Sequence, residues 1–250
     1  MLEGWLARGL GPVVAVEPKP ASRLRKLNGV RFVSTVEEIP PGPIRACVVA
    51  LKPQILKTQA ARFRAIAERG TPMISIAAGT GIAFLTRAWG RQAHILRAMP
   101  NTPGAIGRGI SALYASPRAT GADRKLAERL LSSLGPTIWV ASERLIDVTT
   151  AVSGSGPAYV FLLVEALADA AEAEGMPRAA AEKLARATIT GAGALLDADK
   201  RSPGELRRDV ASPGGTTEAA LGILMKPNGL DRLIRRAVAA ASKRAGELAS

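Results

Sequence analysis

The chain has 250 residues, a length that suits one large domain or two small ones. Apolar residues make up 47% and charged residues 22%, which excludes a disordered chain because enough apolar surface is present to bury a core. The net charge of +13 is typical of a nucleic-acid binder, of an enzyme that acts on anions, or of a protein from an arginine-rich background. A single cysteine and a single histidine exclude a disulfide framework and argue against a metal site, so we expect no metal.

The first residues, MLEGWLARGLGP, have an acid at Glu3 and no charged segment ahead of an apolar run, so we expect no signal peptide. No window holds the roughly 18 uncharged apolar residues that a membrane-spanning helix requires. The sequence therefore predicts a cytoplasmic location and no membrane partner.

The first part of the chain alternates short β-rich runs with helical stretches. Helical spacing is found in residues 1–10, 55–69 and 122–134. The predicted strands are Val13–Val16, Arg31–Ser34, Ala46–Leu51, Met73–Ala77, His94–Met99, Ile110–Tyr114 and Thr137–Val140. Apolar strands separated by helices indicate βαβ units and a parallel sheet that helices cover on both faces.

From about Asp147 the β signal is lost and long helical stretches rich in Ala and Leu take over. The predicted helices are Pro157–Glu174, Arg178–Ala198, Thr216–Leu224 and Leu230–Ala249. We therefore expect an α/β domain over residues 1–146, of the Rossmann-like dinucleotide-binding class, and an all-α domain over residues 147–250.

Three loops of unusual composition follow predicted strands in the α/β part. They are VVALKPQ (48–54), SIAAGT (75–80) and RAMPNTPGAIGRG (97–109). Ligands of open α/β sheets bind beyond the carboxyl ends of the strands, where small residues let a ligand approach the backbone. Each loop taken alone is equally consistent with an ordinary connection in which prolines and glycines only end the strand and shape a turn.

Two further loops begin predicted helices. AVSGSGPAY (151–159) and DVASPGGTTEAA (209–220) combine glycines, hydroxyls and free amide groups at a helix start, which suits an anionic ligand. The alternative for the first loop is a linker with a helix cap. The alternative for part of the second is that Glu218 serves as a capping-box partner.

VVALKPQ, SIAAGT, RAMPNTP, SGSGPAYVF and LRRDVASPGGTTEAAL, in this order, resemble pyrroline-5-carboxylate reductases across nearly the whole chain. The last of these motifs is the most specific. The resemblance implies reduction of 1-pyrroline-5-carboxylate to L-proline, the last step of proline biosynthesis, with NADPH or NADH. It also implies a cofactor domain followed by a helical domain that intertwines into homodimers, which assemble further into rings in some members.

The same resemblance assigns roles to individual residues. Thr217 is expected to be the catalytic residue, because its hydroxyl would hydrogen-bond the ring nitrogen of the imine. The substrate carboxylate would be held by Ser212, Gly214, Gly215, Thr216 and Thr217. The cofactor would contact Leu51, Lys52, Pro53, Ala77, Ala78, Gly79, Met99, Pro100 and Asn101, with Ser155 and Gly156 at the junction with the substrate. Such a site aligns two rings for hydride transfer and needs neither histidine nor cysteine.

The sequence departs from the family pattern at its start. The family opens with a strand and a glycine-rich turn over the pyrophosphate, whereas this sequence opens in the helix that should follow them. Loss of that central strand would leave a gap in the sheet. Either Met1 is an internal methionine of a longer chain, or the chain is truncated and impaired in cofactor binding.

The choice between NADH and NADPH is expected to depend on the residues that follow Val13–Val16, which corresponds to the second strand of the family's cofactor domain. Glu17 at that position would bind the ribose 2′-hydroxyl and favour NADH, whereas Lys19 and Arg23 nearby could accommodate NADPH. Cys47 and His94 are expected to be structural.

Two alternatives from other classes remain open at this point. The first is a truncated homologue that acts only as a helical dimer module. The second is a basic nucleic-acid-binding protein, although the basic residues are scattered and aromatic residues make up only 4% of the chain.

Overall fold

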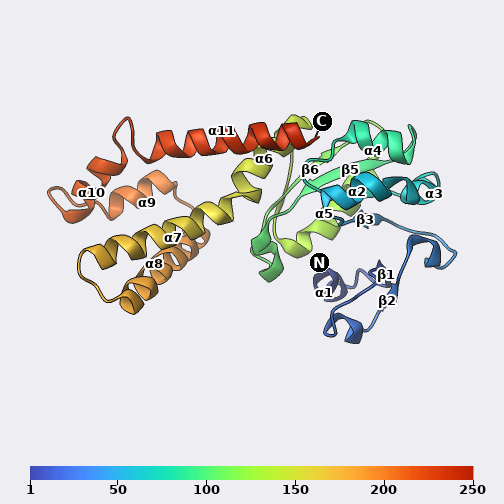
Figure 1. Ribbon diagram of the computed structural model, residues 1–250, viewed down its shortest axis with the longest axis horizontal. Coiled ribbons are helices and arrows are strands. Elements are labelled where there is room, and N and C mark those ends of the chain that lie inside the picture. Colours follow the sequence, from blue (N-terminus) through green and yellow to red (C-terminus); the bar gives the residue numbers. More distant parts are fainter. Residues whose placement is uncertain (250) are drawn as a thin grey trace. The chain divides into compact units, whose positions relative to one another are not determined.

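The computed structural model describes residues 1–249, with side chains to 248, and they form two compact units (Figure 1). The first unit contains residues 1–154 and the end of the chain from Ala241. The second contains residues 155–240. These compact units divide the chain after Gly154, whereas the sequence predicts domains that divide after residue 146, and the predicted domains stay a prediction. The division of cofactor and substrate roles between these parts stays a prediction.

A five-stranded sheet forms the centre of the first unit, and its strand order follows the sequence (Figure 1). Its strands are β3 (Cys47–Val49), β4 (Met73–Ser75), β5 (Ile95–Met99), β6 (Ser111–Ala115) and β7 (Thr137–Trp139). All pairs are parallel except β5 with β6, which run antiparallel. The predicted parallel sheet is confirmed except between β5 and β6, where the connection 100–110 is too short to carry a crossover helix.

The first two predicted strands form a sheet of their own. Strand β1 (Val13–Val16) pairs in parallel with β2 (Val30–Val33) and not with the larger sheet. Among the described strands, β1 and β3 therefore have a partner on one side only. The described chain thus has two separate sheets, and the predicted gap between them stays a prediction.

Helices cover both faces of the five-stranded sheet. Neighbouring residues of β4 and β5 belong to two separate apolar clusters: Met73 pairs with Ile95 in one, and Ile74 pairs with Leu96 in the other. Alternate side chains of a strand point to opposite faces, so each cluster fills one face. The helices of this unit are α1 (Leu2–Leu6), α2 (Pro53–Gln59), α3 (Arg64–Ala67), α4 (Ile82–Trp89), α5 (Gly121–Leu131) and α6 (Arg144–Thr149).

The predicted helix over residues 55–69 is divided. A 3-10 segment, Ala60–Phe63, separates α2 from α3, and the Ala60 carbonyl accepts a hydrogen bond from the Trp89 indole at 3.0 Å. Another indole, that of Trp5 in α1, donates to the Leu130 carbonyl at 2.8 Å and fixes α1 against α5. The expected helix at the chain start is therefore present, although it ends at Leu6.

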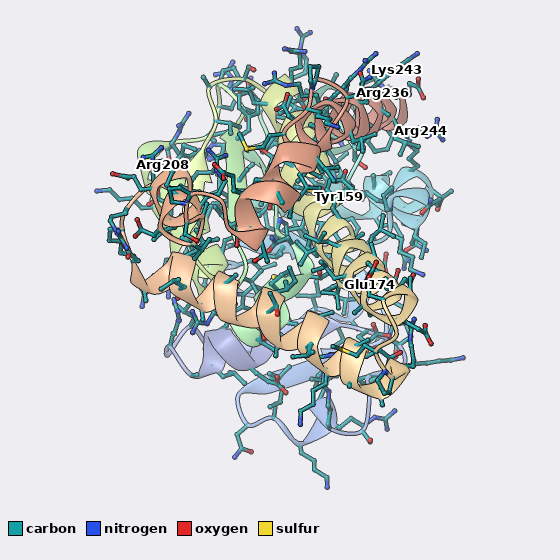
Figure 2. The ribbon with its side chains drawn as sticks, turned by 90° about the vertical axis from the view of Figure 1, so that its left-hand side faces the viewer. Tyr159, Glu174, Arg208, Arg236, Lys243 and Arg244 are labelled. Carbon is teal, nitrogen blue, oxygen red and sulfur yellow. The ribbon has the colours of Figure 1, made fainter. Side chains whose placement is uncertain are left out.

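The second unit consists of helices alone. They are α7 (Gly156–Ala173), α8 (Arg178–Ala198), α9 (Pro203–Asp209), α10 (Thr216–Leu224) and the first part of α11 (Leu230–Ala249), and Figure 2 labels Tyr159 and Glu174 at the two ends of α7. Arg178 at the start of α8 pairs with Asp169 and Glu172 of α7 and with Glu182. These pairs hold α7 and α8 as a hairpin.

This helical unit buries little apolar surface within one chain. Its buried cluster consists of the small side chains of Ala168, Ala181 and Ala185. Phe161 and Leu162 on α7 are 62% and 64% exposed, and Ile223 on α10 is 66% exposed. Exposed apolar surface of this extent marks an interaction site.

One helical stretch, Arg144–Ala173, is long and apolar enough by length and composition to cross a membrane. Its most apolar window of 18 residues has a mean hydropathy of 1.4. The stretch includes charged and polar residues, so it is not the uninterrupted apolar run that the sequence was expected to lack, and the absence of a membrane span stays a prediction. This test alone is weak, because helices that pack inside soluble proteins also pass it.

Candidate functional site

Three of the predicted cofactor loops meet at one edge of the sheet. Strands β3, β4 and β5 are parallel neighbours, and their registers align Val49 with Ser75 and Ser75 with Arg97. The carboxyl ends of parallel neighbours lie at the same edge. The structure therefore brings together the loops that contain Leu51–Pro53, Ala77–Gly79 and Met99–Asn101.

The loop after β4 is packed against the end of α11. Gly79 has a φ of +59°, and a Cβ atom built on it would lie 2.6 Å from the Cβ of Leu248. The Leu248 carbonyl accepts a hydrogen bond from Lys57 Nζ at 3.3 Å. Glycine is thus required here both by the left-handed backbone and by the close approach of the helix. Ala77 is buried and Ala78 is half-buried, so Ala78 offers more surface to a ligand.

The end of β5 is joined to a π-helical turn, Thr150–Gly154. The side-chain nitrogen of Asn101, Nδ2, donates to Ser153 Oγ at 3.2 Å. Its side-chain oxygen, Oδ1, accepts from the backbone N–H of Ile110 at 3.0 Å. A Cβ atom on Gly154 would lie 2.8 Å from the methyl carbon of Met99. Asn101 therefore shapes the loop with both ends of its side chain, and the glycine lets the strand end approach the turn.

A partly buried ion pair lies beside these loops. Arg97 on β5 has a side chain that is only 3% exposed, and its Nη1 atom lies 2.8 Å from Glu143 Oε1. The same oxygen accepts a hydrogen bond at 2.6 Å from the backbone N–H of Ile82, the first residue of α4. This ion pair was not predicted from the sequence. The signal available was an arginine inside the apolar run HILRAM.

Asp147 on α6 is the second acid near Arg97. Burial raises the pKa of its carboxyl group; the positive charge of Arg97 opposes that rise, and the negative charge of Glu143 adds to it. Its Oδ1 atom is buried without a hydrogen-bond partner within the described chain. The positive charge of Arg97 therefore interacts with both Glu143 and Asp147.

Glu17 lies at the end of β1, in the two-stranded sheet. Its backbone N–H donates to the Val33 carbonyl at 2.9 Å, and its carboxylate accepts from the Lys19 amide at 3.0 Å. Glu17 and Lys19 are both exposed. Glu17 thus follows its strand as the sequence predicts, on a different sheet from the three loops.

The predicted substrate loop lies in the second unit, before α10. Gly214 has a φ of +70°, and a Cβ atom on Gly215 would lie 2.6 Å from Ser212 Oγ, so both glycines are needed for this turn. The Gly215 amide donates to the Ser212 carbonyl at 3.0 Å. Thr216 and Thr217 form the first turn of α10, where backbone N–H groups have no partner within the helix. The loop therefore presents amides and hydroxyls at a helix start.

Glu218 takes part in the same loop. Its carboxylate accepts a hydrogen bond from the Gly214 amide at 2.7 Å, one residue before the helix cap at Gly215. Glu218 therefore does not form a capping box with the N-cap residue Gly215, and it bonds the preceding residue instead. The amide of Gly214 is occupied by this bond.

Ser155 and Gly156 begin α7 in the second unit. Ser155 is the N-cap residue without a side-chain cap bond, and Gly156 is the first helical residue. Both are half-buried. The predicted site residues thus fall on two units, with Ser155, Gly156 and the Thr217 loop on the second.

Cys47 and His94 have structural surroundings. Burial raises the pKa of the Cys47 thiol to about 12, so it stays protonated. His94 Nδ1 lies 2.9 Å from Asp123 Oδ2, and Asp123 forms a capping box with Thr120 at the start of α5.

Residues 143–248 match the family described as pyrroline-5-carboxylate reductase dimerisation. The chain is 38% identical over 252 residues to a pyrroline-5-carboxylate reductase of Pseudomonas aeruginosa, covering 100% of this chain and 92% of that protein. It is 39% identical to one from Pisum sativum, covering 94% of this chain and 85% of that protein.

Two solved structures are also similar. The pyrroline-5-carboxylate reductase of Coxiella burnetii has a TM-score of 0.89 at 33% identity and covers 100% of this chain and 93% of its own. A Plasmodium falciparum pyrroline carboxylate reductase with NADP bound has a TM-score of 0.79 at 27% identity, with coverage of 95% and 87%. The similarity therefore extends over both units.

Proposed function

The chain belongs to the pyrroline-5-carboxylate reductase family, and on this premise we propose that it reduces 1-pyrroline-5-carboxylate to L-proline with NADH or NADPH. The observation that carries the proposal is the meeting of the Lys52, Ala78 and Met99 loops at the carboxyl edge of three parallel strands. That edge is where α/β sheets bind nucleotides. The nucleic-acid alternative is not favoured.

The residues at this edge suit a nicotinamide ring. Ala78 is small and half-buried, and Pro53 begins α2 with a fixed backbone, so a flat ring can approach the chain closely there, while Ala77 and Gly79 are buried behind it in the packing of the loop. A bound nicotinamide would supply the hydride that reduces the imine carbon. The chain's own contribution is to hold and orient the ring.

The loop before α10 suits the substrate carboxylate. The amides of Thr216 and Thr217 lie at the positive end of the α10 dipole, which stabilises an anion. The Thr217 hydroxyl would hydrogen-bond the ring nitrogen and fix the face of the imine that receives the hydride. Ser212, Gly214 and Gly215 shape the turn that presents these groups.

Residues 143–248 are a dimerisation region, so the chain forms homo-oligomers. We propose that a second copy covers the exposed apolar side chains of α7 and α10, and that a ring of dimers is the larger assembly. A stretch such as Arg144–Ala173 then packs against protein rather than lipid, which supports a cytoplasmic location. The net charge of +13 would attract the anionic substrate and cofactor.

The test is a direct assay of the full chain. NADH and NADPH are each titrated by calorimetry, and proline formation from 1-pyrroline-5-carboxylate is followed with both cofactors. We expect binding and cofactor-dependent turnover. A dimeric chain that binds neither cofactor would support the alternative, a helical dimer module without reductase activity.

A further inference from the structure

A buried contact fixes the helix that follows the Ala77–Gly79 loop. Given the proposed function, we infer that Glu143, held by Arg97, is a positioning residue that keeps this loop in the shape that receives the cofactor. Glu143 acts through Ile82 and does not touch the cofactor itself.

The contact replaces a missing helix cap. Helix α4 begins at Ile82 after an N-cap glycine, Gly81, which has no side chain to accept a hydrogen bond from the first turn. Glu143, 61 positions away in sequence, accepts the Ile82 N–H at 2.6 Å. The start of α4 is therefore capped from another element, at the point where the cofactor loop ends.

Arg97 determines where the Glu143 carboxylate lies. A buried guanidinium stays charged and needs partners that accept its N–H groups, and here Arg97 Nη1 lies 2.8 Å from Glu143 Oε1. Arg97 itself is fixed in β5, where it pairs with Ser75 of β4. Strand β5, the neighbour of the strand that precedes the loop, and helix α4, which follows the loop, are thus connected through one carboxylate oxygen.

The loop between β4 and α4 depends on this connection. Thr80 is 1% exposed, and its hydroxyl has no hydrogen-bond partner within the described chain. A buried hydroxyl without a partner destabilises the conformation that contains it. Losing the cap at Ile82 would therefore let the first turn of α4 open and move Ala77–Gly79 out of position.

The test compares Glu143→Ala with Glu143→Gln, whose amide oxygen can still accept from Ile82. Glu37→Ala is the matched control, because it removes an acid from an exposed ion pair with Arg62 in the same unit. Hydrogen exchange in residues 76–85 reports the cap independently of activity. Calorimetric Kd and steady-state KM and kcat with NADH and NADPH report its consequence.

We expect Glu143→Ala to speed exchange in α4's first turn and to raise the cofactor Kd and KM about tenfold, with a smaller change in kcat. Glu143→Gln should return the cofactor Kd to within about threefold of the wild-type value, because it keeps the hydrogen bond. Glu37→Ala should change neither measurement.

A second variant covers the case in which Glu143→Ala does not fold. Ile82→Pro removes the donated N–H and the isoleucine side chain at a helix position where proline is tolerated, and Ile82→Ala controls for the lost side chain. Ile82→Pro should raise the cofactor Kd as Glu143→Ala does.

An unchanged cofactor Kd in both Glu143→Ala and Ile82→Pro, with a wild-type chain that binds cofactor, would overturn the positioning role alone. A wild-type chain that binds neither cofactor would overturn the proposed function and this inference together. Equal weakening by Glu143→Gln and Glu143→Ala would also contradict the cap.

Discussion

The two units of the chain differ in how they use their apolar residues. The first places large side chains on both faces of its sheet, where Met73, Ile74, Ile95 and Leu96 are almost fully buried. The second buries alanines and leaves its large apolar side chains exposed, Phe161 among them. The first unit completes its own core, whereas the second exposes the apolar surface that we propose a second copy covers.

The largest expected effect is loss of the oligomer when the exposed apolar surface of the second unit is changed. Phe161→Asp places a charge on a surface that a second copy should cover, and each buried Phe contributes about 1.5–3 kcal/mol. We expect the oligomer to dissociate at micromolar concentration in analytical ultracentrifugation. Ile106→Asp is the control, since Ile106 is 79% exposed in the first unit. If Phe161→Asp keeps the wild-type mass, the account of the second unit fails.

The next effect tests how the first unit holds its β4 loop. Gly79→Ala should cost about 2–3 kcal/mol in the free energy of unfolding, from backbone strain and from contact with Leu248. Gly107→Ala is the matched control, because Gly107 has a φ of +72° and open space around its missing Cβ, so it should cost only about 1–2 kcal/mol. Denaturant unfolding measures both. Equal costs would show that the α11 contact contributes nothing.

A smaller effect concerns cofactor choice in the first unit. Glu17→Gln removes the charge that would repel a 2′-phosphate. The ratio of kcat/KM for NADPH to that for NADH should rise about tenfold, which corresponds to about 1.4 kcal/mol. An unchanged ratio would remove Glu17 from the cofactor site.

The smallest effect is a pH dependence at the surface of the first unit. Hydrogen bonding to Arg62 lowers the pKa of Glu37 from 4.5 to about 2. Since the folded pKa lies below the ordinary value, this stabilisation is present above pH 4.5 and is lost as the pH falls through about 2. The Tm difference between wild type and Arg62→Ala should therefore shrink over that range. A constant difference would contradict the assignment.

Local sequence signals predicted the strands of both sheets well. Val13–Val16 and Thr137–Val140 are bounded by prolines, glycines or polar residues, so their ends are visible in the sequence. Helix α9 was not predicted, although Ser202 and Glu205 form the capping box that its sequence encodes. That signal was available and short helices are easily overlooked beside longer ones.

Other features depend on contacts between distant parts of the chain. The Arg97–Glu143 pair joins residues 46 positions apart, and the approach of Leu248 to Gly79 brings the chain's end back to the first unit. No periodicity or motif encodes such pairs. The antiparallel direction of β6 follows from a short connection, which the strand pattern alone does not reveal.

The most direct test of the account asks whether the loop of the second unit serves the chemistry of the cofactor edge. Turnover of 1-pyrroline-5-carboxylate is measured for Thr217→Ala and Thr217→Ser, together with the calorimetric Kd for NADH and NADPH. We predict that Thr217→Ala lowers kcat about 10²-fold with the cofactor Kd unchanged, and that Thr217→Ser retains most of the activity. Wild-type turnover in Thr217→Ala would contradict the account.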